Sequence, residues 1–196
     1  MTFMRKLIFP IFTVLTFTIS ATQPLHANQD QPKLLEFKEV EWIDLMPEED
    51  FEALMNPPDY ISDIVEGSEE DQLRNLGEGN DFFDDDPYQQ ALTSTKIVEE
   101  MDGKAIRIPG FMVPLEWDDN QSVLQFFLVP FLGACIHVPP PPPNQVIHVT
   151  TSTAIETWDL YTPFWISGVI QTSYIENDIA AATYAMELQS IEVYED

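Results

Sequence analysis

The 196-residue sequence contains one cysteine, Cys135, and only 8 lysine and arginine residues against 34 aspartate and glutamate residues. A single cysteine excludes a disulfide within the chain. The formal net charge of −26 has the wrong sign for binding nucleic acid, so we exclude that function. The Cys-x-x-Cys motifs of redox proteins and of haem attachment are also missing.

Long hydrophobic runs are missing after the first 27 residues, where none has the length of a transmembrane helix. Residues 1–27 have the features of a signal peptide. Arg5 and Lys6 precede an apolar stretch from Leu7 to Ile19, and the small residue Ala27 follows. We expect cleavage after Ala27 and export to the periplasm, without a stable membrane anchor after cleavage. An uncleaved anchor is the alternative.

We expect residues 28–102 to form an acidic, mainly helical N-terminal region. Partial alternation over 39–45 predicts a short strand or an extended segment. A helix is expected after Pro47, because proline and carboxylates favour a first helical turn. Further helices are expected over Ser68–Leu76 and from Asp86 to about Glu100.

Residues 103–196 carry strand patterns instead, and we expect them to form a small β-barrel domain. The Pro109-Gly110 pair interrupts the first pattern and predicts a bulge or bend. Five short strands with glycines at bends predict a closed barrel of the oligonucleotide/oligosaccharide-binding (OB) type, and therefore an α+β fold for the whole chain. The expected strands are Ala105–Val113, Val123–Phe131, Gln145–Thr151, Phe164–Ile170 and Tyr184–Tyr194.

The most distinctive stretch joins the second and third expected strands. Cys135 and His137 are two residues apart, so on a strand their side chains leave the same face. The prolines that follow favour polyproline II, in which five residues span about 15 Å. A tight hairpin is therefore not expected unless one X-Pro bond is cis. The stretch then contains Pro139, Pro140, Pro141, Pro142, Pro143, Asn144, Gln145 and, on the next strand, His148.

Residues 109–116 and 127–145, which include the string Gly-Ala-Cys-Ile-His-Val-Pro-Pro-Pro-Pro-Pro-Asn-Gln, resemble a bacterial family known as domain of unknown function 3299. The similarity continues through residues 165–168 and 184–186. The resemblance implies a small exported protein. More loosely, it implies an accessory role beside membrane transport systems, including metal-linked ones. It provides no assigned catalytic residues.

One hypothesis is a transition-metal site formed by Cys135, His137 and His148, because thiolate and imidazole suit zinc or copper. An antiparallel register with Val138 opposite Gln145 places His148 opposite Cys135. Met112 and Glu116 are the candidates for a fourth ligand, and Met112 suits copper.

Two other interpretations concern the same loop. In one, the cysteine and histidines are structural, and Asn144 and Gln145 supply the hydrogen bonds that prolines cannot make. The proline arm, residues 139–145, then serves as a docking surface for a partner. In the other, Cys135 is a nucleophile activated by His137, and the protein is a cysteine-dependent enzyme.

We therefore predict an exported non-enzymatic accessory protein whose partner is a membrane transporter or another exported protein. The cysteine-dependent enzyme is the alternative. The four tryptophans are expected to pack in the core or at its rim rather than to form a ligand cage. They are Trp42, Trp117, Trp158 and Trp165.

Overall fold

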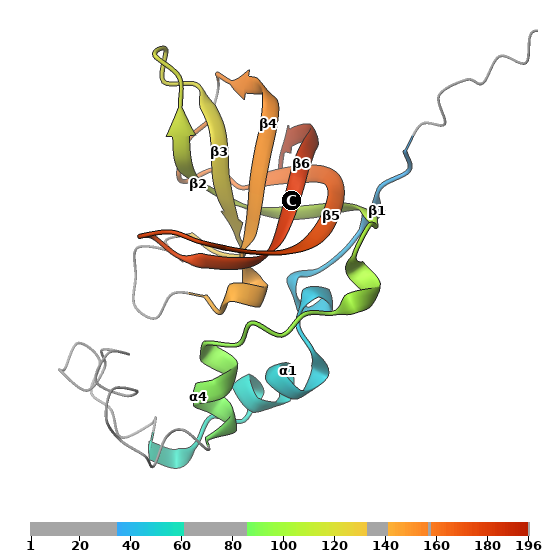
Figure 1. Cartoon of the computed structure of the whole chain (residues 1–196), viewed down its shortest axis with the longest axis vertical. Helices are drawn as coiled ribbons and strands as arrows, with labels where there is room; N and C mark the ends of the chain where they lie inside the picture. Colours follow the sequence, from blue (N-terminus) through green and yellow to red (C-terminus); the bar gives the residue numbers. More distant parts are fainter. Residues whose placement is uncertain (1–34, 61–85, 133–140, 157, 196) are drawn as a thin grey trace, which may run out of the picture. The chain divides into compact units, whose positions relative to one another are not determined.

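Six strands form the sheet of this protein, whose structure is a computed structural model that describes residues 35–60, 86–132, 141–156 and 158–195 (Figure 1). The strand order is β1-β2-β3-β4-β6-β5, and a further pairing of β2 with β5 closes five of the strands into a barrel. The expected OB-like barrel with a few short helices is confirmed. The strands are β1 Lys38–Glu39, β2 Ala105–Trp117, β3 Val123–Val129, β4 Ile147–Ile155, β5 Phe164–Glu176 and β6 Ala181–Val193.

Strand β2 closes the barrel by changing partner halfway along its length. Residues 105–110 pair with β5, and residues 111–117 pair with β3. The change falls at Gly110, where a Cβ atom would lie 2.8 Å from the carbonyl oxygen of Val129. Only glycine leaves room for this approach, so the bend predicted at Pro109-Gly110 marks the corner of the barrel.

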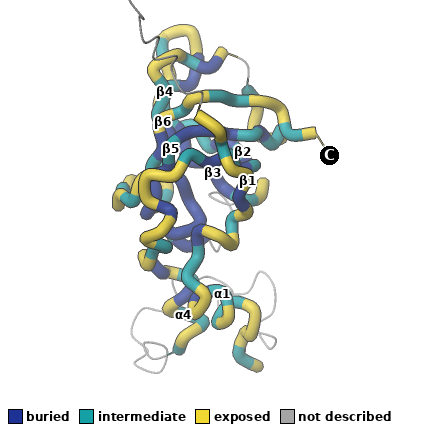
Figure 2. The backbone as a smooth tube through the Cα atoms, turned by 90° about the vertical axis from the view of Figure 1, so that its right-hand side faces the viewer, coloured by how far each residue is buried: buried dark blue, intermediate teal, exposed yellow. Residues whose placement is uncertain are grey.

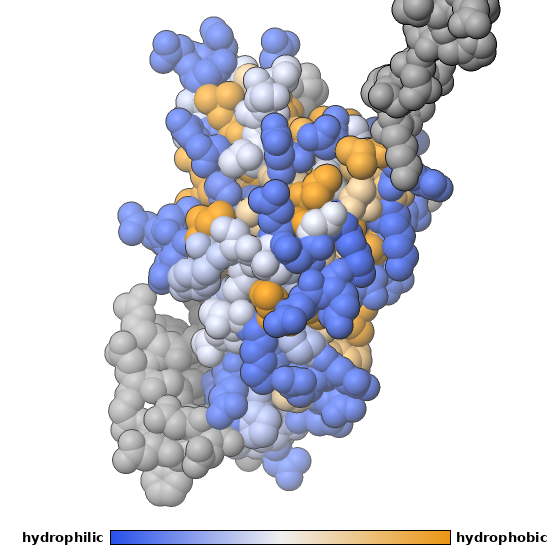
Figure 3. Space-filling model, turned by 45° about the vertical axis from the view of Figure 1, so that its right-hand side comes forward, coloured by the Kyte–Doolittle hydropathy of each residue, from blue (hydrophilic) through white to orange (hydrophobic). Residues whose placement is uncertain are grey.

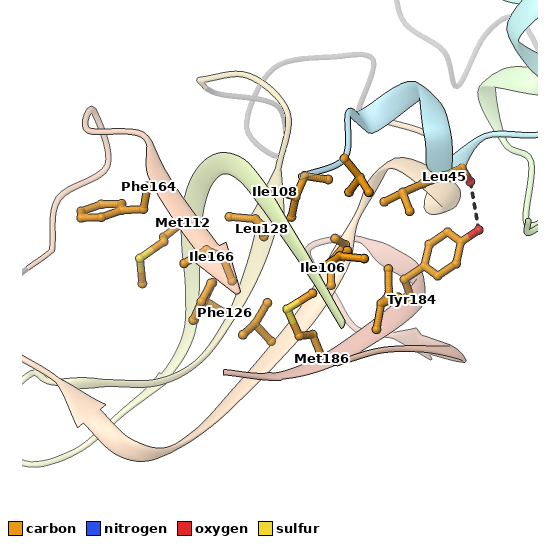
Figure 4. Close-up of a cluster of buried hydrophobic side chains, with 14 of the residues drawn as sticks. Leu45, Ile106, Ile108, Met112, Phe126, Leu128, Phe164, Ile166, Tyr184 and Met186 are labelled. Atoms are coloured by element: carbon orange, nitrogen blue, oxygen red, sulfur yellow. Dashed lines mark hydrogen bonds between the residues drawn. The ribbon is translucent and has the colours of Figure 1, made fainter. Parts of the chain in front are cut away.

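The strands pair antiparallel except for β4 with β6, which run parallel, and the two-residue β1, which runs parallel to β2. Alternate side chains of each strand fill the interior. On β2, for example, Ile106, Ile108 and Met112 are fully buried, whereas Arg107, Pro109 and Phe111 are only partly buried. Figure 2 shows the buried backbone concentrated in the barrel strands, and Figure 4 shows the side chains that fill it.

The N-terminal region contributes to the same core. Leu45 and Met101 belong to the buried cluster that includes the barrel residues Phe126 and Ile166. The hydroxyl of the buried Tyr184 donates to the carbonyl oxygen of Leu45 at 2.9 Å (Figure 4). It also accepts from the backbone N–H of Val98 at 2.7 Å. This one side chain therefore binds two separate N-terminal segments to β6.

The helices are shorter than the sequence predicts. Helix α1, Glu48–Met55, follows Pro47 as expected, but the segment expected to be extended over 39–45 contains a 3-10 helix, η1, at Trp42–Leu45. Helix α4 covers Pro87–Leu92, and the prediction that it continues to Glu100 is wrong. The backbone beyond it bonds instead to tertiary partners, since Lys96 accepts from Asn144 and Val98 donates to Tyr184. A separate 3-10 helix, η2, covers Glu99–Met101. The expected helix at Ser68–Leu76 lies outside the described residues.

No helix among the described residues is long and apolar enough to cross a membrane. The face drawn in Figure 3 is mainly hydrophilic, and apolar side chains occur on it as separate patches.

Replacing Gly168 of β5 by alanine is expected to destabilise the barrel by about 1–3 kcal/mol, because overpacking forces neighbouring groups to move. The added Cβ would lie 2.5 Å from the backbone oxygen of Glu187 and 2.5 Å from Cγ of Met186. Urea unfolding measures the loss. Gly103→Asn is the control: Gly103 has a φ of +73° and nothing within 4 Å of a Cβ, and asparagine tolerates that conformation. An equal loss in both variants would contradict the steric explanation.

Tyr184→Phe is expected to lower the free energy of unfolding by about 1–3 kcal/mol, because a buried N–H and a carbonyl oxygen lose their partner. Urea unfolding again measures the change. Tyr174→Phe is the matched control, since the Tyr174 side chain is exposed and its hydroxyl donates only to Glu176, two residues away. A loss at Tyr184 no larger than at Tyr174 would show that this link does not hold the N-terminal region.

Candidate functional site

The candidate ligand His148 lies on β4, on the outer side of the barrel. Its neighbours on the strand, Ile147 and Val149, are fully buried, whereas His148 is partly exposed. Its ring meets the edge of Phe127 on β3, with centroids 5.9 Å apart and planes at 72°. Cys135 and His137, together with Pro139 and Pro140, lie outside the described residues.

The predicted register of the Cys–His stretch is wrong. His148 pairs with Phe127 of β3 on one side and with Ala185 of β6 on the other. The pairing positions on both sides of His148 are therefore taken by β3 and β6. Cys135 is not its cross-strand partner. The physical reason is that β3 already ends at Val129, so the antiparallel pairing runs through Leu128 and Ile147.

Three polar side chains on neighbouring strands form a hydrogen-bonded chain on this outer face. The Gln125 amide on β3 donates from Nε2 to the Glu116 carboxylate on β2. Because Nε2 of Gln125 points to Glu116, Oε1 of the same amide points to His148. The distance from this oxygen to Nε2 of His148 is 3.2 Å. A carbonyl oxygen can only accept, so Nε2 of His148 carries the hydrogen and, in the neutral ring, Nδ1 holds the lone pair.

The surroundings of the imidazole also favour its neutral form. Partial burial lowers the pKa of His148 below the ordinary histidine value, because a charged ring loses hydration there. An oriented neutral imidazole whose second nitrogen donates to a carbonyl is the arrangement typical of metal-binding histidines. His148 can therefore act as a ligand or as a proton acceptor through Nδ1.

The two candidates for a fourth ligand have different positions. Met112 is fully buried in the barrel core (Figure 4), whereas His148 is partly exposed. The prediction that Met112 is a ligand alongside His148 is therefore wrong, since strand alternation directs the two side chains apart. Glu116 lies on the outer face but reaches His148 only through Gln125. Within the described part of the chain, no three His, Cys, Asp or Glu side chains are grouped closely enough to hold a metal ion.

The described part of the proline arm, residues 141–145, is largely buried. Pro141, Pro142, Asn144 and Gln145 are buried, and the last two belong to a 3-10 helix, η3, at Pro143–Gln145. This burial contradicts the expected docking surface at these residues. The physical reason is that the amide side chains of Asn144 and Gln145 bond inward rather than toward solvent.

Asn144 and Gln145 connect the barrel to the N-terminal region. Nδ2 of Asn144 donates to the buried Asp50 carboxylate at 3.1 Å and to the backbone oxygen of Lys96 at 3.2 Å. Nε2 of Gln145 donates to the backbone oxygen of Trp42 at 2.9 Å. These amide groups are hydrogen-bond donors directly after a proline run that has no backbone N–H of its own.

A second feature of the outer surface combines aromatic and acidic residues that are far apart in the sequence. Trp42 and Trp165 line a groove together with Tyr194 and two glutamates. Trp42 also packs against the core, as predicted, but the meeting of these rings has no signal in the linear sequence. Only the pairing of β5 with β2 and β6 brings them together.

Titration of His148 by NMR is expected to show the Nε2–H tautomer and a pKa below about 6.5. Because the unfolded chain has the higher pKa, it binds the proton more readily, and His148 reduces the free energy of unfolding as the pH falls through that unfolded-state pKa. Gln125→Leu removes the acceptor and is expected to raise the share of the Nδ1–H tautomer. His148→Gln removes the contribution to acid sensitivity. An Nδ1–H tautomer in the unmodified protein would contradict the hydrogen-bond chain.

Comparison with known proteins identifies the family of this chain. A solved structure of a DUF3299 family protein from Pseudomonas aeruginosa PAO1 is similar, with 32% sequence identity, a TM-score of 0.59, and coverage of 82% of this chain and 98% of that one. No curated protein matches the sequence. The family model described as protein of unknown function (DUF3299) matches residues 42–193, which include all five barrel strands. The chain therefore belongs to the DUF3299 family, as its motifs predict.

Proposed function

We propose that this protein is an exported, non-enzymatic accessory protein of a membrane transport system that binds a zinc or copper ion at His148 with Cys135 and His137. The observation that carries the proposal is the orientation of His148 by Gln125, which leaves Nδ1 as the lone-pair donor. Imidazole and thiolate together form a ligand set that suits these two metals. Export and the transport partner rest on the signal-like N-terminus and on the family resemblance.

The topology of the barrel supports the proposed grouping of ligands. Residues 133–140, which include Cys135 and His137, connect the end of β3 to the approach to β4. Antiparallel pairing of Leu128 with Ile147 places those two strand ends side by side, one residue pair from His148. The two strand ends that the connection joins therefore lie close to the oriented imidazole. A bound metal would supply Lewis acidity and a link between the segment and the barrel.

Metal analysis of the exported protein, purified without chelator, tests this proposal. We expect about one zinc or copper ion per chain. We also expect a molecular mass that corresponds to a chain beginning at Asn28. Cys135→Ser and His148→Ala are expected to weaken zinc affinity at least about 100-fold, and Gln125→Leu about 10-fold, because loss of an orienting partner typically costs 10- to 100-fold. Competition with a metallochromic chelator measures these affinities.

Met112→Leu is the matched control, since its side chain lies in the core, and its zinc affinity is expected to equal that of the unmodified protein. If the Cys135 and His148 variants bound zinc as tightly as the unmodified protein, the proposed site would be overturned. Fast alkylation of Cys135 by iodoacetamide at neutral pH in a metal-free protein would favour the cysteine-dependent enzyme instead, because a reactive thiolate is accessible and has a lowered pKa.

A further inference from the structure

A groove of about 380 Å³ opens on the outer side of the barrel, away from His148. Its walls come from four regions of the sequence: the segment before α1, strand β2, strand β5 and the residue that follows β6. We call it the aromatic groove. It is lined by Glu39, Val40, Glu41, Trp42, Pro109, Trp165 and Tyr194.

The walls of the aromatic groove are held in place by contacts within the chain. The indole Nε1 of Trp42 donates to the backbone oxygen of Pro109 at 2.7 Å. The rings of Trp165 and Tyr194 lie 5.1 Å apart at an angle of 47°. Aromatic surfaces fixed in this way bind a ligand without an additional ordering cost.

A contact within the chain indicates which kind of ligand group this surface can bind. The guanidinium carbon of Arg107 lies 4.3 Å from the centroid of the Trp165 ring. The same guanidinium is paired with Glu39 and with Glu192, each at 2.9 Å. A planar cation stacked on an indole and bound by carboxylates is therefore already present beside the groove.

The groove has carboxylate that Arg107 does not pair with. Of the two glutamates that line it, Glu39 is paired with Arg107, whereas Glu41 has no ion pair among the described residues. Arg107 is also the last basic residue of the chain, since neither lysine nor arginine occurs from Ile108 to Asp196. An aromatic wall with surplus carboxylates favours a cation over a neutral ligand.

We propose that the aromatic groove binds the guanidinium group of an arginine carried by a partner protein. Arginine fits better than lysine, because a planar guanidinium both stacks on indole and bonds to carboxylates in two directions. A neutral sugar could stack on the same rings but would gain nothing from the local charge. This inference goes beyond the proposed metal site and uses none of its residues.

NMR of the indole N–H groups tests the proposal in the unmodified protein. Four tryptophans give four indole signals, and tryptophan-to-phenylalanine variants assign them. The probe is the peptide acetyl-Gly-Gly-Arg-Gly-Gly-amide. We expect the signals of Trp42 and Trp165 to shift on titration, and those of Trp117 and Trp158, which do not line the groove, to stay unchanged.

The same peptide with citrulline in place of arginine is the matched ligand control, since citrulline has nearly the same shape but no charge. Equal shifts with citrulline, shifts only with the neutral sugar cellotetraose, equal shifts at all four tryptophans, or no shift would each overturn the proposal. Loss of metal from the protein leaves this result unchanged, so failure here is distinguishable from failure of the metal site.

Two substitutions measure the contributions of the groove. Trp165→Leu is expected to raise the dissociation constant of the arginine peptide about two- to thirty-fold, the range of a cation–π contact. Glu41→Gln is expected to raise it about two- to five-fold, as for an exposed ion pair. Trp117→Leu, on an exposed residue outside the groove, is expected to leave it unchanged. Equal weakening by Trp117→Leu would show binding to the acidic surface in general.

Discussion

Closure of the barrel through β2 is the constraint on which the other features depend. A single strand serves two partners, β5 along its first half and β3 along its second, and Gly110 makes the corner between them. Once the barrel is closed, every second side chain of each strand must point inward. The interior is then filled by large apolar residues, and polar chemistry is restricted to the outer face.

Both proposed sites follow from this restriction. His148, Gln125 and Glu116 come from three adjacent strands and face outward together. The aromatic groove forms on the outer face where β2 and β5 pair near the end of β6. The two sites use different strand pairs, so one can be altered without removing the other.

Attachment of the N-terminal region uses a few polar contacts in addition to apolar side chains such as Leu45 and Met101, which belong to the barrel core. The Tyr184 hydroxyl and the amides of Asn144 and Gln145 bond to backbone groups of the segments before α1 and after α4. Buried hydrogen bonds of this kind add modest net stability when made and cost more when one partner is lost. They explain why the Asn-Gln end of the distinctive motif is internal: its amides bind the chain to itself.

Hydrophobic alternation, glycine positions and turn residues by themselves determined that residues 103–196 form a five-stranded barrel, because these signals act locally along each strand. The same local signals identified the helix after Pro47, and the motifs identified the family. They failed for the helix expected up to Glu100, since Asn144 and Tyr184, both distant in sequence, take the backbone hydrogen bonds of that segment.

Only the tertiary structure decided which residues meet. The partners of His148, the placement of Met112 in the core and the meeting of Trp42 with Trp165 are consequences of strand register, and register depends on contacts between residues far apart in the sequence. A sequence pattern predicts the face of the strand on which a side chain lies. It does not predict which residue of a neighbouring strand that side chain contacts, because only barrel closure brings the strands together.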